Sequence, residues 1–330
     1  MTQFPYRSMS AVRSLFTVRS LFTLCLALTL HGVLFGQAAT TTLFRPRSFL
    51  SGARALGFAD AYIADIHDVN SMYWNPASLV YMRNTSVVLN HTLDRTSNIM
   101  NENIATPLFV RKGEVVAIGL TVNHVGHVSK SPLSDFKVLQ YGYDVAYSKE
   151  IIPTFCIGGS VNVRYGDAPS GKLWAFSSSV GVFYSPAEGI TYGAVLGGIG
   201  NGIRYTYDGA ATILSSERLP RDLQVGATMQ FPGAARKTML TLSIANEKVF
   251  GQDGLRYKGG AEYILLQLVA VRMGYIVDPD VQVATYGLGL RAGRWELDYG
   301  MLPSRLTDRL YQFTLAYDLW NRGESIRTDR

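Results

Sequence analysis

The chain has 330 residues, of which 47% are hydrophobic, 12% aromatic and only 17% charged, and its net charge is +6. Average soluble domains are about 25% charged, and disordered chains combine high charge with few aromatic residues, so the composition excludes extensive disorder. It also excludes a coiled coil, which is rich in Ala, Glu, Lys and Leu. Lysines and arginines form no cluster after residue 38, which argues against nucleic acid as a partner.

Residues 1–38 have the organisation of a secretory signal peptide. Residues 1–20 contain three arginines and no acidic residue, 21–36 are mainly apolar, and small residues lead up to a cleavage site near Ala38. The alternative, a membrane-anchoring helix, is disfavoured because the apolar stretch is shorter than the roughly 20 residues that cross a bilayer. We therefore expect export, after which Cys156 is the single remaining cysteine and no intrachain disulfide forms.

Residues 84–320 alternate between apolar and small or polar residues, the period of β-strands. From 139 to 148, for example, the odd positions are Leu, Tyr, Tyr, Val and Tyr, and the even positions are Gln, Gly, Asp, Ala and Ser. Segments of about ten residues match the roughly nine to eleven that cross a bilayer as a tilted strand. Strands of a soluble β-sandwich, the alternative, usually span about five or six. The sequence thus predicts an all-β fold, a transmembrane antiparallel β-barrel of about 14 strands.

The expected strands and their connections support an outer-membrane barrel. Long connections alternate with short ones, as expected for external loops and periplasmic turns. The longest connection is 200–221, and a polar periplasmic tail, 321–330, follows the last strand. The expected strands are 85–93, 104–111, 114–125, 137–149, 154–165, 173–185, 190–199, 222–231, 237–246, 256–264, 267–277, 281–291, 294–302 and 309–319.

Charged residues within these strands share the small and polar face. An Arg on the lipid face at mid-bilayer costs about 2–4 kcal/mol, so this face is expected to line the lumen. A shift of one residue would expose all of these charges to lipid. Inside a barrel such charges usually pair with one another. The six expected lumenal charges are Asp144, Arg164, Glu262, Arg272, Glu296 and Asp298.

Residues 39–83 lack the strand pattern and precede the first strand, so we expect them to form a hatch in or under the lumen. The runs 52–57 (GARALG) and 68–79 (DVNSMYWNPASL) resemble the N-terminal signature of the PorV/PorQ (UPF0164) family, which belongs with the FadL-type channels. The resemblance implies an outer-membrane barrel of fourteen strands with an N-terminal hatch. Some members import hydrophobic compounds, and PorV and PorQ serve the type IX secretion system.

Within this segment, Asn75, Pro76 and Ala77 form the candidate hatch motif. Pro76 fixes its own φ and pushes Asn75 out of the helical region, which gives a rigid turn whose Asn amide can tie the hatch to the wall. The alternative is a local turn without a functional role. A possible apolar ligand pocket is formed by Phe58, Tyr62, Met72, Tyr73 and Trp74.

The sequence offers no catalytic constellation, metal-ligand spacing or phosphate-binding loop, so we expect neither an enzyme nor a cofactor or metal. Two functions remain. The first is a type IX secretion-associated scaffold that binds secreted cargo or secretion-system components through its external loops. The alternative is a FadL-like channel for hydrophobic compounds such as long-chain fatty acids. The polar lumenal face disfavours a continuous apolar conduit but allows a local hydrophobic site. Either function places the chain in outer-membrane lipid.

Overall fold

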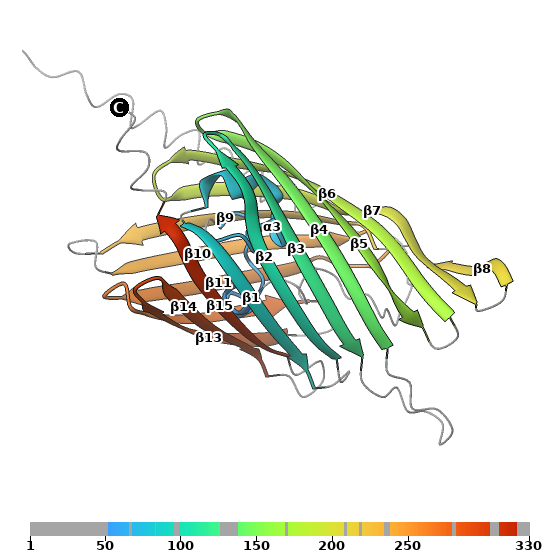
Figure 1. The fold of residues 1–330 in the computed structure, drawn as a ribbon. Coiled ribbons are helices and arrows are strands. Elements are labelled where there is room, and N and C mark those ends of the chain that lie inside the picture. The colour runs from blue at the N-terminus through green and yellow to red at the C-terminus, as the bar shows by residue number, and fades with distance from the viewer. Residues whose placement is uncertain are drawn as a thin grey trace, which may run out of the picture.

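The computed structural model describes residues 52–321, apart from 66–67, 83, 96–98, 126–137, 169–170, 208–209, 218–219, 234–237, 279–281 and 304–309 (Figure 1). The expected signal peptide, 1–38, lies outside the described residues, and so does the expected tail, 321–330, except for Asn321. No helix in the described part of the chain is long and apolar enough to cross a membrane.

Fourteen of the described strands form one closed antiparallel barrel, in which β1–β7 and β9–β15 pair with their neighbours and β1 pairs with β15. The additional strand β8 pairs with the end of β7 and projects from the barrel as the arm of a hairpin (Figure 1). The strands are β1 (Asn84–Asp94), β2 (Ile99–Arg111), β3 (Glu114–Val125), β4 (Val138–Ile152), β5 (Phe155–Ala168), β6 (Gly171–Ala187), β7 (Ile190–Tyr207), β8 (Ala210–Glu217), β9 (Asp222–Pro232), β10 (Met239–Val249), β11 (Arg256–Leu265), β12 (Val269–Val277), β13 (Gln282–Ala292), β14 (Trp295–Leu302) and β15 (Leu310–Asn321).

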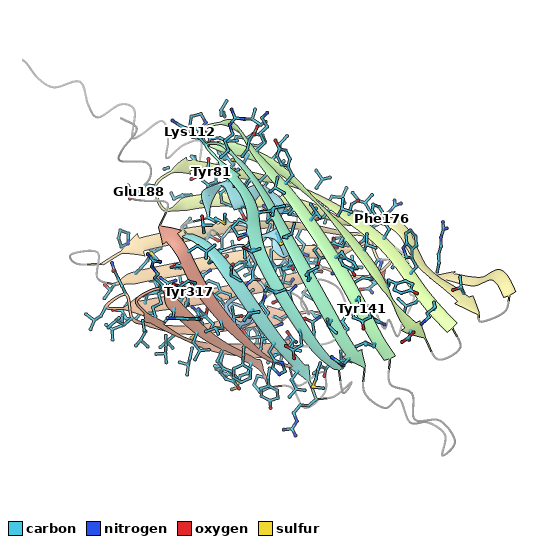
Figure 2. The ribbon with its side chains drawn as sticks, viewed as in Figure 1. Tyr81, Lys112, Tyr141, Phe176, Glu188 and Tyr317 are labelled. Carbon is cyan, nitrogen blue, oxygen red and sulfur yellow. The ribbon has the colours of Figure 1, made fainter. Side chains whose placement is uncertain are left out.

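The two faces of the barrel wall differ as the alternation predicts. Along β4, Tyr143 and Val145 are about half exposed on the outside, whereas Gln140 and Asp144 are buried on the inside. Figure 2 shows the side chains standing on both sides of the strands, with Tyr141 and Tyr317 among them. An apolar outer face and a polar inner face suit a barrel that spans a bilayer, so the predicted fold class is confirmed.

The N-terminal part of the described chain, residues 52–65 and 68–82, is nearly all buried inside the barrel, and we call it the lumenal segment. It contains the short helices α2 (Ala53–Gly57), α3 (Ser71–Trp74) and the 3-10 helix η2 (Pro76–Tyr81). Helix α2 packs against β12–β15 and η2 against β3–β6, so the segment crosses the lumen from one wall to the other.

Glycines on the inner wall allow this segment to approach closely. A Cβ at Gly158 of β5 would lie 2.5 Å from the Ala77 nitrogen, which is closer than real Cβ atoms come to other atoms. One at Gly274 of β12 would lie 2.6 Å from the Ala59 nitrogen. Glycines on the lumenal face therefore make room for the backbone of the segment.

One expected connection is wrong in part. Residues 200–221 were expected to be a loop, but β7 continues to Tyr207 and β8 follows at Ala210–Glu217. The glycine-rich run 197–202 breaks the alternation in the sequence. The ladder between β6 and β7 absorbs this break through register shifts between Phe176 and Ser177 and between Ser178 and Val180.

Candidate functional site

The Asn75 amide connects two parts of the lumenal segment to the wall. Asn75 has an extended backbone (φ −137°, ψ 98°) directly before Pro76, the first residue of η2. Its Nδ2 donates to the Ile63 carbonyl (2.9 Å) and to the Val182 carbonyl of β6 (3.0 Å), and its Oδ1 accepts from the Ala77 nitrogen (3.1 Å). The side chain is fully buried, so loss of the amide would leave two carbonyls without these donors inside the barrel.

A second connection is made by Arg54 of α2, which is buried. Its guanidinium donates to both carboxylate oxygens of Glu262 on β11 (3.0 and 2.8 Å), to the Tyr62 hydroxyl (2.7 Å) and to Asp65. Glu262 also accepts from Arg272 of β12 (2.6 Å). The bidentate contact makes Arg54 a directional link between the segment and the wall.

The six expected lumenal charges fall into three groups. Glu262, Arg272 and Asp298 form one network, in which Arg272 donates to Asp298 at 2.5 Å. Asp144 accepts from Arg164 (2.7 Å) on the neighbouring strand. Glu296 lies apart from these ion pairs and accepts from Arg291 (3.0 Å).

The Asp144 group continues through amides toward the lumenal segment. Thr121 donates to Asp144, and Asn103 donates to Thr121 (3.0 Å) and to the Tyr73 hydroxyl (2.7 Å). On the next strand, Asn90 donates to Asn103 and to the Asn70 side chain. The polar inner face of β1–β4 thus binds the segment through hydrogen bonds.

The five residues of the expected apolar pocket are divided among three environments. The Cζ atom of Arg54 lies over the ring of Phe58, 5.3 Å from the ring centre. Tyr62 and Trp74 pack together with their ring centres 6.3 Å apart. Met72 and Tyr73 belong to a cluster with residues of β1–β4. All five are at most 5% exposed, so a ligand could touch them only after the segment moves.

Neither Arg54 nor Asp65 is predicted as a site residue from the sequence. Both lie in a stretch without periodicity, where the face of a side chain cannot be read from the pattern. A signal was present nonetheless, because Arg54 is the single Lys or Arg between Ser48 and Met82. A lone cation among aspartates in a segment bound for the lumen points to an ionic partner.

The polar groups of the site attach the lumenal segment to the barrel wall. Among the residues that the structure describes, no three His, Cys, Asp or Glu side chains come together to hold a metal ion. Carboxylates, guanidinium groups and amides instead pair the segment with the wall on opposite sides of the lumen. Fold and site together define a class, a transmembrane β-barrel that contains its own N-terminal segment.

Known structures share this fold. The CymD monoaromatic hydrocarbon channel matches with a TM-score of 0.57 at 9% identity, over 82% of this chain and 98% of that one. The Ralstonia pickettii toluene transporter TbuX matches with 0.53 at 13% identity (81% and 98%), and a Pseudomonas aeruginosa FadL homologue with 0.52 at 12% (82% and 98%). No protein-family model and no curated protein matches the chain. The similarity shows a FadL-like β-barrel fold.

Proposed function

We propose that the chain is an outer-membrane channel for hydrophobic small molecules, gated by its lumenal segment. The observation that carries the proposal is the segment itself, which crosses the lumen and is bound to opposite walls by Arg54 and by Asn75. The chain shares its fold with a monoaromatic hydrocarbon channel and a toluene transporter. This similarity supports a channel function over the other functions of a β-barrel.

The distribution of apolar groups also favours a hydrophobic solute. The inner wall carries mainly amides, hydroxyls and charges, with a few large apolar side chains such as Phe183 and Leu173. Phe58, Met72 and Trp74 of the segment add further large apolar side chains within the lumen. Movement of the segment would expose these side chains to an entering molecule. The segment would then act both as the gate and as the hydrophobic surface for the solute.

The secretion-associated scaffold, which the sequence reasoning placed first, rests on the motif resemblance alone, and so does membership of the PorV/PorQ family. Two of the solved structures that share the fold are, by their names, a hydrocarbon channel and a toluene transporter, which favours the alternative. Recovery of exported proteins with the intact barrel in native pull-downs would restore the scaffold as the better proposal.

Deletion of residues 52–82 tests the channel. In planar bilayers we expect the variant to conduct well above the intact protein, because Arg54, Asn75 and the three helices are removed together. Proteoliposomes should also take up toluene faster. The control replaces the exposed loop residues 251–254 by Gly and Ser, which leaves the lumen unchanged. Unchanged conductance from a folded, heat-modifiable barrel would exclude the gate.

A further inference from the structure

The turn after α2 has an unusual backbone. Ala59 (φ 56°) and Asp60 (φ 60°) are both left-handed, a conformation that residues with a Cβ rarely adopt. The turn is pressed against two wall glycines, since a Cβ at Gly260 would lie 2.6 Å from the Phe58 oxygen and one at Gly274 2.6 Å from the Ala59 nitrogen. Such strain persists only where the surroundings impose it, and here β11 and β12 do so.

The Asp60 carboxyl is buried without a matching partner. It is 6% exposed, and its Oδ1 has no hydrogen-bond partner among the described residues. The charged groups that face it are Glu247 of β10 and Arg256 and Lys258 of β11. Both cations already bind other acids: Lys258 is 2.8 Å from Glu247, and Arg256 is 3.3 Å from Glu247 and 2.7 Å from Asp278. An ionised Asp60 would therefore add an uncompensated negative charge to this wall.

Asp60 belongs to the lumenal segment, outside the membrane-spanning strands. Burial raises the pKa of its carboxyl from 3.8 to about 7, with Lys258 and Arg256 opposing the shift and Glu247 adding to it. A carboxyl with a higher pKa in the docked state binds its proton more tightly there. Docking is thus most favourable below about pH 4 and weakens as the pH rises from about 4 to about 7. About three pKa units correspond to an about thousandfold change in the ratio of released to docked turn.

We propose that Asp60 is a proton-controlled latch of the lumenal segment, a regulation that rests on the proposed gate. With a neutral carboxyl the turn 58–60 docks between Gly260 and Gly274. When the proton leaves to water, the carboxylate drives the turn off β10–β12. The η2 end stays in place because its bonds, from Asn75 to Val182 and from Ser148 to Ala77, contain no ionisable group.

The test follows the burial of the turn as the pH changes, in the full exported chain reconstituted in phosphatidylcholine vesicles. The reporter is Ala61→Cys in a Cys156→Ala background, since Ala61 is fully buried next to Asp60. Its rate of labelling by a water-soluble maleimide is divided by the rate for Gln252→Cys in an exposed loop, which removes the titration of the thiol itself. From about pH 5.5 to about pH 8.5 we expect the normalised rate to rise at least about tenfold.

Substitutions assign the effect to Asp60. Asp60→Asn should label slowly throughout, and Glu247→Gln, which frees Lys258 to pair with Asp60, should flatten the rise. Burial also raises the pKa of Asp68 to about 7, beside Glu296, Arg54 and Asp298, so Asp68→Asn is the matched control and should keep the rise. No rise in the parent, a rise that survives Asp60→Asn, or one that Asp68→Asn abolishes would each overturn the latch. Labelling requires no transport, so an unchanged conductance after deletion of 52–82 would refute the gate and leave the latch standing.

Discussion

At the scale of single residues, the docking of the lumenal segment depends on Arg54, whose guanidinium is surrounded by three acceptors. Asp65 and Glu262 are both fully shielded from solvent, and Tyr62 completes the set. Buried ion pairs contribute modest net stability, but removal of one member leaves an uncompensated charge and costs about 3–5 kcal/mol. The link is thus more important for holding one arrangement than for the total stability of the barrel.

We therefore expect Arg54→Met to release α2 from β11 while the barrel stays folded. Asp65 would lose its guanidinium partner, and Glu262 would lose its bidentate contact with Arg54 while keeping the contact with Arg272. Hydrogen exchange of residues 52–65 should accelerate by at least about a hundredfold, as a cost of about 3 kcal/mol requires. Arg291→Met, which removes a partly exposed arginine paired with Glu296, is the control and should leave this exchange unchanged. Equal protection in Arg54→Met and the parent would show that packing alone holds α2.

At the scale of elements, glycines of the barrel wall allow the backbone of the lumenal segment to pack closely against the strands. In β11, neighbouring Gly259 and Gly260 face opposite ways: a Cβ at Gly259 meets nothing within 4 Å, whereas one at Gly260 would touch Phe58. The same pairing of a small wall residue with segment backbone recurs on β5 and β12. The inner surface is thus shaped to hold a folded peptide.

Gly260→Ala should displace the turn 58–60, whereas Gly259→Ala should not. The added methyl group would lie 2.6 Å from the Phe58 oxygen, so the turn or the strand must shift, at a cost of about 1–3 kcal/mol. Brief openings in planar bilayers should become more frequent in Gly260→Ala only. Identical conductance records from the two variants would indicate that the strand, rather than the turn, shifts to accommodate the methyl group.

The elements also show what the sequence could and could not predict. Strand positions follow from alternation because a lipid-facing wall forces one face to be apolar. The sequence predicts all fourteen barrel strands, although β2 begins five residues earlier than predicted, at Ile99 instead of 104, and β7 ends eight residues later, at Tyr207 instead of 199. The lumenal segment could be distinguished from the barrel only because its sequence lacks the two-residue alternation of the strands. Its contacts with the wall, such as Arg54 with Glu262 or Asn75 with Val182, join residues far apart in the chain, so no local pattern encodes them. The hairpin of β7 and β8 was missed because glycine, which has no side chain, obscures the alternation.

At the scale of the whole molecule, the barrel presents an apolar exterior to lipid around a polar, peptide-filled interior. The outer face carries the large exposed hydrophobic side chains, and the lumen holds most buried charges, such as Arg272 and Asp298. This inversion relative to a soluble protein requires a hydrocarbon solvent outside. The stability of the wall should therefore depend on the depth of any charge that is placed on its outer face.

Met273, at the centre of β12 and 60% exposed on the outer face, provides the test. Met273→Arg places a guanidinium against hydrocarbon midway along a strand and should destabilise the barrel by about 2–4 kcal/mol. Ala292→Arg adds the same charge at the end of β13, where the interface hydrates it, and should cost about 0–1 kcal/mol. Urea titrations in phosphatidylcholine vesicles, followed by the heat-modifiable mobility of the folded barrel, measure both. The two neighbours of Met273, Arg272 and Gly274, face the lumen, so the position cannot turn inward without reversing β12. Equal unfolding midpoints for the two variants would mean that β12 does not face lipid.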